Sequence, residues 1–513
     1  MLPLVFAAAL SGSSAEAQSS APTLPDTSYL AGEPEGQTLG LTLEQAQKLG
    51  IANSPLTRAA LGSLHSARGF RMSEAGAFDP VVVAANEQIS INSPVSSPFA
   101  ASETRERLVT GGVSWLSPIG TSISVSMVQD KIESNAPFTT LPRERNARAR
   151  VNFVQPLLKG FGTAATRGEL RARDREVEAA ERRYESAELQ LSADVEASYW
   201  TLYAIERDLD ARLRQRQSAA VFLRDQLLRG QAGVAGPAAV AAARTFLADQ
   251  DAILLESRLA VRTASDRLAQ AIGISPGANA RLHANDDPIP PPALDPLEDV
   301  VRRAMVVNTE LQAAEQDSIA ALHRLKRAAW NAWPSIEAFG GYGGQGLAGT
   351  SQQLVFAGDT LGSAADTGFD HAWDQVWGDD FPEWNFGLRL VMPIPWRADR
   401  GEHERARGEY ERSREVLRAR RLALETDVRT VYREAETARA TLTALRELLS
   451  ATQEQARIGR LEYQAGRATA YDIVDLEAQV AGAQLRMSQA MVRVARSRTE
   501  LRRLTQPAPQ RTP

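Results

Sequence analysis

The longest pattern of hydrophobic and polar positions along the chain is helical. From Thr163 to about Arg229 the sequence has no proline, and apolar residues recur at spacings of three, four or seven. That spacing is typical of a long α-helix that packs against other helices. About 65 residues at ~1.5 Å each predict a rod of roughly 100 Å, too long for the inside of a compact domain. The stripe comprises Leu191, Val195, Tyr199, Leu202, Leu209 and Leu213.

The helical pattern occurs twice. Residues 167–271 align with residues 400–504 without a gap. Each half therefore predicts one helix, several strands, a very long helix, a turn and a returning helix. The clearest matches are Asp194 with Asp427, Tyr199 with Tyr432, and Gln231-Ala232-Gly233 with Gln464-Ala465-Gly466.

Between the helices the period changes to two. Ile123, Val125 and Met127 alternate with serines, and the segments 109–115, 148–153 and 385–392 alternate in the same way. Such alternation is typical of membrane strands around a wet lumen, although one face of a soluble sandwich alternates likewise. The tight turn 117–120 and the long connections 93–106, 130–147 and 343–383 favour the membrane interpretation.

Six strands cannot close a wet barrel alone, and an open strand edge in lipid would leave backbone groups unpaired. Several copies must therefore share one barrel. The predicted fold class is mainly α with membrane β. Very long antiparallel coiled-coil helices accompany β-strands contributed to a β-barrel shared between copies, which the family resemblance given below implies to be trimeric, and the sequence carries an internal two-fold repeat.

These patterns set the predicted boundaries. The N-terminus is divided into a signal peptide, 1–17, and a flexible mature arm, 18–40. The first repeat, 41–274, comprises helix 41–75, strands 79–155, long helix 163–229, turn 230–236 and helix 237–272. A proline-rich linker, 275–296, follows. The second repeat, 297–506, comprises helix 297–330, strands 335–395, long helix 398–462, turn 463–468 and helix 469–505, before a disordered tail, 507–513.

Composition narrows the function classes. The formal net charge is −5, which argues against nucleic-acid binding. The chain has no cysteine, so thiol catalysis, disulfides and thiolate metal sites are excluded. The apolar run 2–10 followed by Ala15-Glu16-Ala17 predicts an export signal cleaved near Ala17.

The sequence resembles the outer-membrane efflux protein (TolC) family over about 43–506. The resemblance rests on the doubled layout, on the strand exits around Gln155-Pro156 and Met392-Pro393, and on the hairpin Tyr463 to Thr469 followed by Asp472 to Asp475. It implies a homotrimeric exit duct of a tripartite efflux or type I secretion system. The duct would lie in the outer membrane of a Gram-negative-type bacterium, with its helices in the periplasm. Its partners would be a periplasmic adaptor, an inner-membrane transporter and outer-membrane lipid, with no cofactor and no nucleic acid.

The resemblance also implies roles for single residues. Adaptors would contact the hairpin tips, Gln231, Ala232, Gly233, Gln464, Ala465 and Gly466. Tyr463, Arg467, Asp472 and Asp475 would form the periplasmic gate. The family's turn arginine does not align well, because Ala468 occupies its place beside Arg467. The first half also carries four strands where the family norm is two.

The residues themselves leave some of these assignments open. Asp472 and Asp475 share one helix face, so three copies would make a ring of six carboxylates that attracts cations. The alternative is a solvated pair that favours the helix N-terminus through its dipole. Gly233 and Gly466 are expected to adopt positive φ, and Tyr463 either lines the throat or packs between rods.

Two other function classes remain. The first is a periplasmic or surface coiled-coil structural protein without a pore, which a soluble, non-conducting chain would favour. The second is an enzyme, for which the sequence gives weak signals. The five histidines are scattered without metal-ligand spacing, and no nucleophile–base pair is suggested, so we expect no catalytic and no metal site.

Overall fold

The computed structural model describes residues 38–97, 99–275, 280–287, 293–356, 359–361 and 365–507. The predicted signal peptide, residues 18–37 of the predicted arm and residues 508–513 of the predicted tail lie outside them. The described chain forms two compact units. The first, called the hairpin unit, takes in residues up to 55, 190–297 and 429–503. The second, called the sheet unit, takes in residues 56–189, 298–428 and 504 onward.

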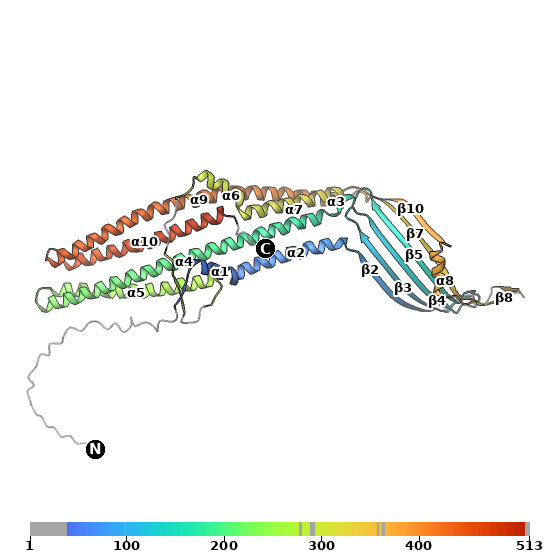
Figure 1. Cartoon of the computed structure of the whole chain (residues 1–513), viewed down its shortest axis with the longest axis horizontal. Helices are drawn as coiled ribbons and strands as arrows, with labels where there is room; N and C mark the ends of the chain where they lie inside the picture. The colour runs from blue at the N-terminus through green and yellow to red at the C-terminus, as the bar shows by residue number, and fades with distance from the viewer. Residues whose placement is uncertain are drawn as a thin grey trace, which may run out of the picture. The chain divides into compact units, whose positions relative to one another are not determined.

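Four long helices dominate the chain, and each pair forms an antiparallel hairpin (Figure 1). The first pair is α4, Gly168–Gln231, and α5, Pro237–Ala271. The second pair is α9, Arg397–Gln464, and α10, Ala470–Thr505. α4 and α9 contribute residues to both units. The two hairpins are the structural counterpart of the sequence repeat, and their ends fall within a few residues of the predicted boundaries.

The main core of the hairpin unit lies along the predicted apolar stripe. Val195, Tyr199 and Leu202 of α4 are fully buried against Val261 and Leu268 of α5. Apolar side chains at helical spacing leave water together when two such helices pair, which stabilises the hairpin. The prediction that Tyr199 packs between helices is confirmed.

The Tyr199 hydroxyl fixes the segment that joins the two repeats. It lies 3.0 Å from the carbonyl oxygen of Leu41 and accepts the backbone N–H of Asp286 at 3.0 Å. Its repeat equivalent, Tyr432, donates to the carbonyl oxygen of Asp295 at 3.0 Å. The two tyrosines therefore each bond to the backbone of this segment, one at Asp286 and the other at Asp295.

The linker and the N-terminal arm are not wholly irregular, which corrects the prediction. Within the linker, β6, Arg281–Ala284, pairs in parallel with β1, Thr38–Leu41. The hydroxyl oxygen of Ser265 in α5 accepts the backbone N–H of Leu282 in β6 at 2.8 Å. These short strands became ordered because the helix surface supplies both apolar contacts and a polar partner.

Both predicted opening helices are broken in two. The first half has α1, Leu43–Asn53, and α2, Pro55–Ala75. Residues before proline avoid the helical region, and Ser54 is extended with ψ 128°. The second half has α6, Leu297–Val307, and α7, Thr309–Asn331, where the side chain of Asn308 caps the new helix by accepting from the N–H of Leu311. The single helices predicted over 41–75 and 297–330 are thus wrong at equivalent places.

The sheet unit contains one six-stranded antiparallel sheet in the order β10-β7-β5-β4-β3-β2 (Figure 1). The first repeat supplies four strands and the second supplies two. Short helical segments, η2 at Gly76–Phe78 and α3 at Gly162–Thr166, stand at its helix-proximal end. The strands are β2, Val81–Asn92; β3, Glu103–Leu116; β4, Ser122–Ser134; β5, Arg143–Pro156; β7, Ser335–Thr350; and β10, Pro382–Val391.

The predicted long loop 343–383 is largely structured, which is a further correction. β7 continues to Thr350, and the connection contains the helix α8, Phe369–Trp377. Two short strands, β8 at Leu354–Phe356 and β9 at Asp359–Leu361, pair with each other. The glycine-rich sequence of β7 hid its strand character, because glycine gives no alternating pattern.

Candidate functional site

The two hairpin turns have the same backbone hydrogen bonds. In the first, the N–H of Gly233 bonds to the carbonyl of Gly230 and the N–H of Val234 to that of Arg229. In the second, Gly466 bonds to Tyr463 and Arg467 to Glu462. Gly233 and Gly466 have φ of 75° and 72°, which glycine adopts without steric cost. The predicted positive φ at both glycines is confirmed.

The tips themselves are open to solvent in the chain. Gln231, Ala232 and Gly233 are exposed at the first turn, and Gln464, Ala465 and Gly466 at the second. Next to them, the side chains of Val234 and Tyr471 are both 74% exposed. Exposed apolar groups at two equivalent turns offer a surface on which another protein can dock.

Tyr463 packs between the two hairpins of the same chain. Its ring lies under the Arg229 guanidinium, 4.6 Å from ring centroid to Cζ, and meets the ring of Phe222 edge-on. Its hydroxyl accepts from the side-chain amide of Gln226 and lies 3.3 Å from a carboxylate oxygen of Asp225. Of the two roles considered for Tyr463, these contacts favour packing between rods.

Asp472 caps the start of α10. Its carboxylate accepts both the hydroxyl and the backbone N–H of Thr469, each at 2.7 Å, while the Thr469 hydroxyl accepts the N–H of Asp472 at 3.3 Å. This reciprocal arrangement is a capping box. The hydrogen bond from the Thr469 hydroxyl, with that from its backbone N–H, lowers the pKa of Asp472 below its usual value.

Asp475 lies one turn further along the same helix face. Both carboxylates are exposed, and Asp475 accepts the side-chain amide of Gln479 at 2.8 Å. Arg467 is exposed at the turn, where its backbone N–H completes the hydrogen-bond pattern. The structure therefore brings Asp472 and Asp475 together on one solvent-facing patch, with Tyr463 on a separate, packed surface.

A buried charge behind this patch was not predicted. The Glu477 side chain is only 8% exposed, and Arg460 of α9 donates to its carboxylate with Nε at 2.8 Å. Gln215 of α4 donates to the carbonyl oxygen of Glu477 at 2.9 Å. The available signal was a charged residue four positions after buried Ile473, on the apolar side of α10. The Arg460–Glu477 pair joins the two helices of the second hairpin near its turn, and Gln215 ties this region to the first hairpin.

The six-stranded sheet has one apolar face, which we call face A. Cross-strand registers place Val113, Val125 and Val151 on it together, with Tyr342 and Trp384 continuing the row. Large apolar side chains on this face stay exposed, and Phe386 and Leu388 are each 69% exposed. A contiguous apolar surface of this kind requires an apolar environment or partner.

The opposite face, called face B, is polar. Arg150 reaches across β7 to β10, where it forms an ion pair with Glu383 and donates to Asn385. Gly341 and Gly343 of β7 make this possible: a Cβ on Gly341 would lie 2.6 Å from the Asn152 side chain and 2.8 Å from the Asn385 side chain. The alternation predicted from the sequence thus corresponds to an apolar and a charged side of one sheet.

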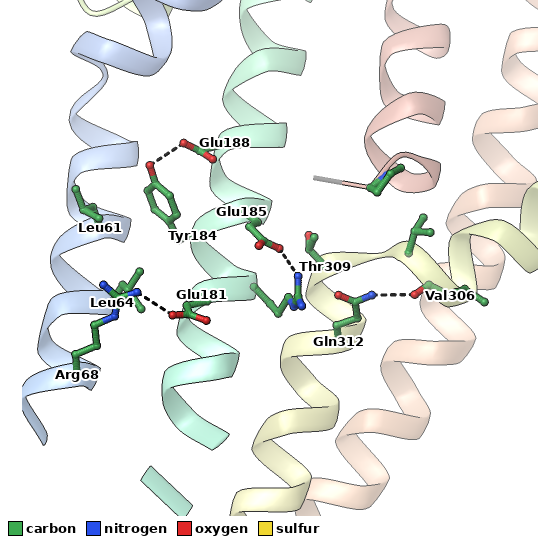
Figure 2. A pocket seen from close by; sticks show the side chains of 13 residues that line it. Leu61, Leu64, Arg68, Glu181, Tyr184, Glu185, Glu188, Val306, Thr309 and Gln312 are labelled. Atoms are coloured by element: carbon green, nitrogen blue, oxygen red, sulfur yellow. Dashed lines mark hydrogen bonds and ion pairs between the residues drawn. The ribbon is translucent and has the colours of Figure 1, made fainter. Parts of the chain in front are cut away.

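The sheet unit also holds a cavity of about 600 Å³ between α2, α4 and the α6–α7 junction (Figure 2). Its wall carries Glu181, which pairs with Arg68 at 2.8 Å, and Tyr184, which donates to Glu188 at 2.7 Å. Figure 2 shows these groups bonded to one another along the wall rather than converging on a common point. The arrangement serves helix packing and gives no catalytic geometry.

Two further findings concern the described residues only. No helix among them combines the length and apolar character needed to cross a membrane. In the same part of the chain, no group of three or more His, Cys, Asp or Glu side chains is arranged to hold a metal ion.

The chain belongs to the outer membrane efflux protein family, whose family model matches residues 122–274 and 300–505. This finding confirms the family resemblance and the mainly helical, two-repeat fold class. The family consists of outer-membrane channels, which agrees with a role other than catalysis. The β2–β3 hairpin precedes the first matched segment.

Solved structures show the same fold at low sequence identity. The CmeC outer membrane channel of Campylobacter jejuni is 13% identical, with 90% of this chain and 85% of that chain covered and a TM-score of 0.63. For the outer membrane protein VceC of Vibrio cholerae the identity is 14%, the coverage 91% and 96%, and the TM-score 0.63. For the open-state MtrE outer membrane channel of Neisseria gonorrhoeae they are 16%, 91% and 89%, and 0.61. No curated protein matches the sequence.

Proposed function

We propose that the protein is a passive exit duct in the outer membrane of a Gram-negative-type bacterium, serving a tripartite efflux or type I secretion system. The observation that carries the proposal is the two-sided sheet. Face A is apolar and exposed, and face B carries Arg150, Glu383 and Asn385. Strands that are apolar toward lipid and polar toward a lumen make a water-filled pore through a membrane.

We infer that three copies share one barrel. Within the described chain, β2 and β10 are the two edges of the sheet. An edge in lipid must find a partner, because each unpaired backbone group there costs several kcal/mol. Pairing of β10 of one copy with β2 of the next satisfies both edges in a closed ring. Three copies of six strands would give about 18 strands, a size at which barrels enclose an aqueous channel.

The hairpin tips are proposed to meet a periplasmic adaptor that couples the duct to an inner-membrane transporter. The exposed turn residues 231–233 and 464–466 and the exposed Val234 and Tyr471 support this assignment. Both turns share one backbone geometry, so an adaptor could engage the two with similar contacts. Because glycine has no side chain, a partner can approach the backbone of the turn closely.

The gate is proposed to consist of Asp472 and Asp475, with Arg467 beside them at the turn. In a trimer the exposed pair would form a ring of six carboxylates around the axis. At ~6 Å two like charges repel by roughly 0.7 kcal/mol in water and by several-fold more in a narrow throat. Such a ring binds cations, and adaptor contact at the neighbouring tips would widen it.

The test is reconstitution. Purified protein in detergent should run as a heat-sensitive trimer and should conduct ions when it is added to a planar lipid bilayer. The detergent requirement follows from face A, and conduction follows from face B. A monomeric chain that stays in solution without detergent and does not conduct would overturn the proposal in favour of a structural coiled-coil protein.

A further inference from the structure

The helix α8 lies directly on face A of the sheet. A Cβ on Gly346 would overlap the carbonyl oxygen of Ala372, and a Cβ on Gly344 would lie 2.9 Å from that of Val376. Ala372 and Val376 are buried against Ala147 and other small residues of β5 and β7. The small glycine and alanine residues at these positions therefore let the helix backbone approach the strands closely, and Figure 1 shows α8 beside the sheet.

The register fixes which face carries the helix. On β7, Gly344 and Gly346 point to the same face as Tyr342, because alternate residues of a strand share a face. On β5, Ala147 shares a face with Val151 for the same reason. Trp373 of α8 donates its indole N–H to Gln129, which lies on the same face of β4 as Met127. All of these residues lie on face A, the side proposed to face lipid.

α8 lies where face A changes from apolar to charged. On face A, β4 carries Gln129 and Lys131 after Met127. On the same face, β5 carries Arg145 next to Ala147, on the side away from Val151. Ala372 lies over Gly346 and Val376 over Gly344, so the C-terminal end of the helix is the end nearer the apolar rows. The helix axis thus descends from the charged rim toward the apolar band.

The segment also completes the hydrogen bonding of β7 beyond the end of β10. β10 begins at Pro382 opposite Gly344, while β7 runs on to Thr350. The side-chain amide of Gln375 accepts the N–H of Leu347 at 2.9 Å and donates to its carbonyl at 3.2 Å, as a neighbouring strand would. The N–H of Gln345 donates to the carbonyl of Phe381 at 3.2 Å. Substitute partners of this kind are needed where water does not reach the backbone.

The exposed side chains at the two ends of α8 differ, with exposed Asp374 between them. The C-terminal end carries Trp377, which is 65% exposed and stacks on Trp373 with ring centroids 5.9 Å apart. The N-terminal end carries exposed Asp370 and His371. Tryptophan concentrates at the boundary between lipid headgroups and acyl chains, because one end of its ring is apolar and the other polar.

We propose that α8 is a lipid-contacting helix on the outside of the barrel, with its tryptophan end at the headgroup–acyl boundary and its acidic end in the headgroup layer. The partner is the lipid bilayer itself. This inference rests on the proposed function, because it requires face A to meet lipid. It gives the acidic connection between β7 and β10 a role: the connection seals the unpaired part of β7 and marks the outer limit of the apolar band.

The absence of cysteine makes a direct test possible, because a single introduced cysteine is the only labelling site. Trp377→Cys and His371→Cys probe the two ends of α8, and both residues are exposed. Leu388→Cys probes face A of β10, and Ser124→Cys probes face B. Each variant of the full-length protein is spin-labelled, reconstituted into lipid vesicles and measured for collision with oxygen, which enriches in lipid, and with a water-soluble nickel chelate.

The expected result is a depth order. The label at position 388 should meet oxygen and exclude the nickel chelate, and the label at position 124 should do the reverse. The label at 377 should be deeper than that at 371, and the difference is limited to about 9 Å, the rise of six helical residues along the axis. If 377 is as open to the nickel chelate as 124, or is shielded from both reagents by protein, the α8 proposal is wrong while the channel proposal stands. If 388 also meets the nickel chelate, the membrane assignment of the whole sheet fails.

Discussion

The first helical hairpin turns at Gly233 and the second at Gly466 with the same hydrogen bonds, yet their chemistry differs. Where the second has Thr469, Asp472 and Asp475, the first has Gly236, Ala239 and Ala242. α5 begins with Pro237, whose fixed φ suits the first turn of a helix, and the N–H of Ala239 bonds to the carbonyl oxygen of Gly236 instead of to a side chain. The comparison shows that the hairpin fold does not require carboxylates. Their presence in one repeat alone therefore points to function.

The two repeats also differ in the number of strands they contribute, and here the first repeat has the addition. The first repeat contributes β2, β3, β4 and β5, while the second contributes β7 and β10 with α8 between them. The first repeat thus widens the sheet, and the second covers part of it. The two copies of the repeat therefore differ both in their strands and in the chemistry of their turns.

The equivalent tyrosines give the largest expected difference between the repeats. Tyr199→Phe leaves the N–H of Asp286 without its buried partner, and this should lower the free energy of unfolding by about 1–3 kcal/mol. Tyr432→Phe removes one bond at a more open position and should cost about 1 kcal/mol or less. Denaturant unfolding of the purified variants at pH 8 measures both. Equal losses would contradict the distinction.

The same pair predicts an alkaline effect. Burial raises the pKa of Tyr199 to about 12, from an ordinary value of about 10. Because the folded-state pKa is the higher one, this group's contribution to stability is complete below about pH 10 and is lost as the pH rises toward 12. The difference in free energy of unfolding between the wild type and Tyr199→Phe should therefore shrink across that interval. Comparing the unfolding midpoints of the two proteins at pH 9 and at pH 11 measures this change.

The tip carboxylates come next. The double variant Asp472→Asn, Asp475→Asn keeps an acceptor for the Thr469 cap but removes the charge, so block of the channel by divalent cations should weaken about tenfold. Single-channel recording with added cation measures it. The reciprocal variant Ala239→Asp, Ala242→Asp, which gives the first hairpin the same charges, should strengthen block. Unchanged block in both variants would remove the carboxylates from the gate.

Reducing the number of strands in the sheet should have a smaller effect, which is measured as channel conductance. Removing residues 81–116 excises β2 and β3 and gives both repeats two strands. The indole of Trp115 donates to the carbonyl of Phe78 at 3.0 Å, so the cut ends lie close together. Barrel diameter grows about linearly with strand number, so conductance should fall about twofold. The variant is first checked for heat-sensitive trimer formation, and an assembled variant with wild-type conductance would show that β2 and β3 lie outside the pore wall.

The smallest effect is the acid response of the second turn. Because the Thr469 hydrogen bonds lower the pKa of Asp472, the cap stabilises α10 above about pH 4 and weakens as the pH falls through the folded-state pKa. Wild type and Asp472→Asn should differ less at pH 3 than at pH 5 in thermal unfolding. Amide exchange at 472, corrected for its intrinsic pH dependence, should rise at low pH, and exchange at Ala239 of the first hairpin, which has no such carboxylate, is the internal control.

Much of this molecule could be predicted from sequence, because the deciding interactions are local. The long helices followed from apolar spacing in α4 and α9, the turns from Gly233 and Gly466, and the two-sided strands from alternation around Val125 and Val151. The predicted boundaries run through the breaks at Ser54-Pro55 and Asn308 although the sequence signals were present, since residues before proline and asparagine caps both mark helix ends.

Contacts between distant elements could not be predicted. Tyr463 meets Asp225, Gln226 and Arg229 only because the second hairpin packs beside the first in one register. Glu477 of α10 meets Arg460 of α9 because these two helices pair within the second hairpin. The position of α8 on face A depends on small residues of two strands that come together only in the sheet. Periodicity in the sequence indicates which side of a helix or strand avoids water. Only the tertiary structure shows which other element covers that side, because the covering residues come from distant parts of the sequence.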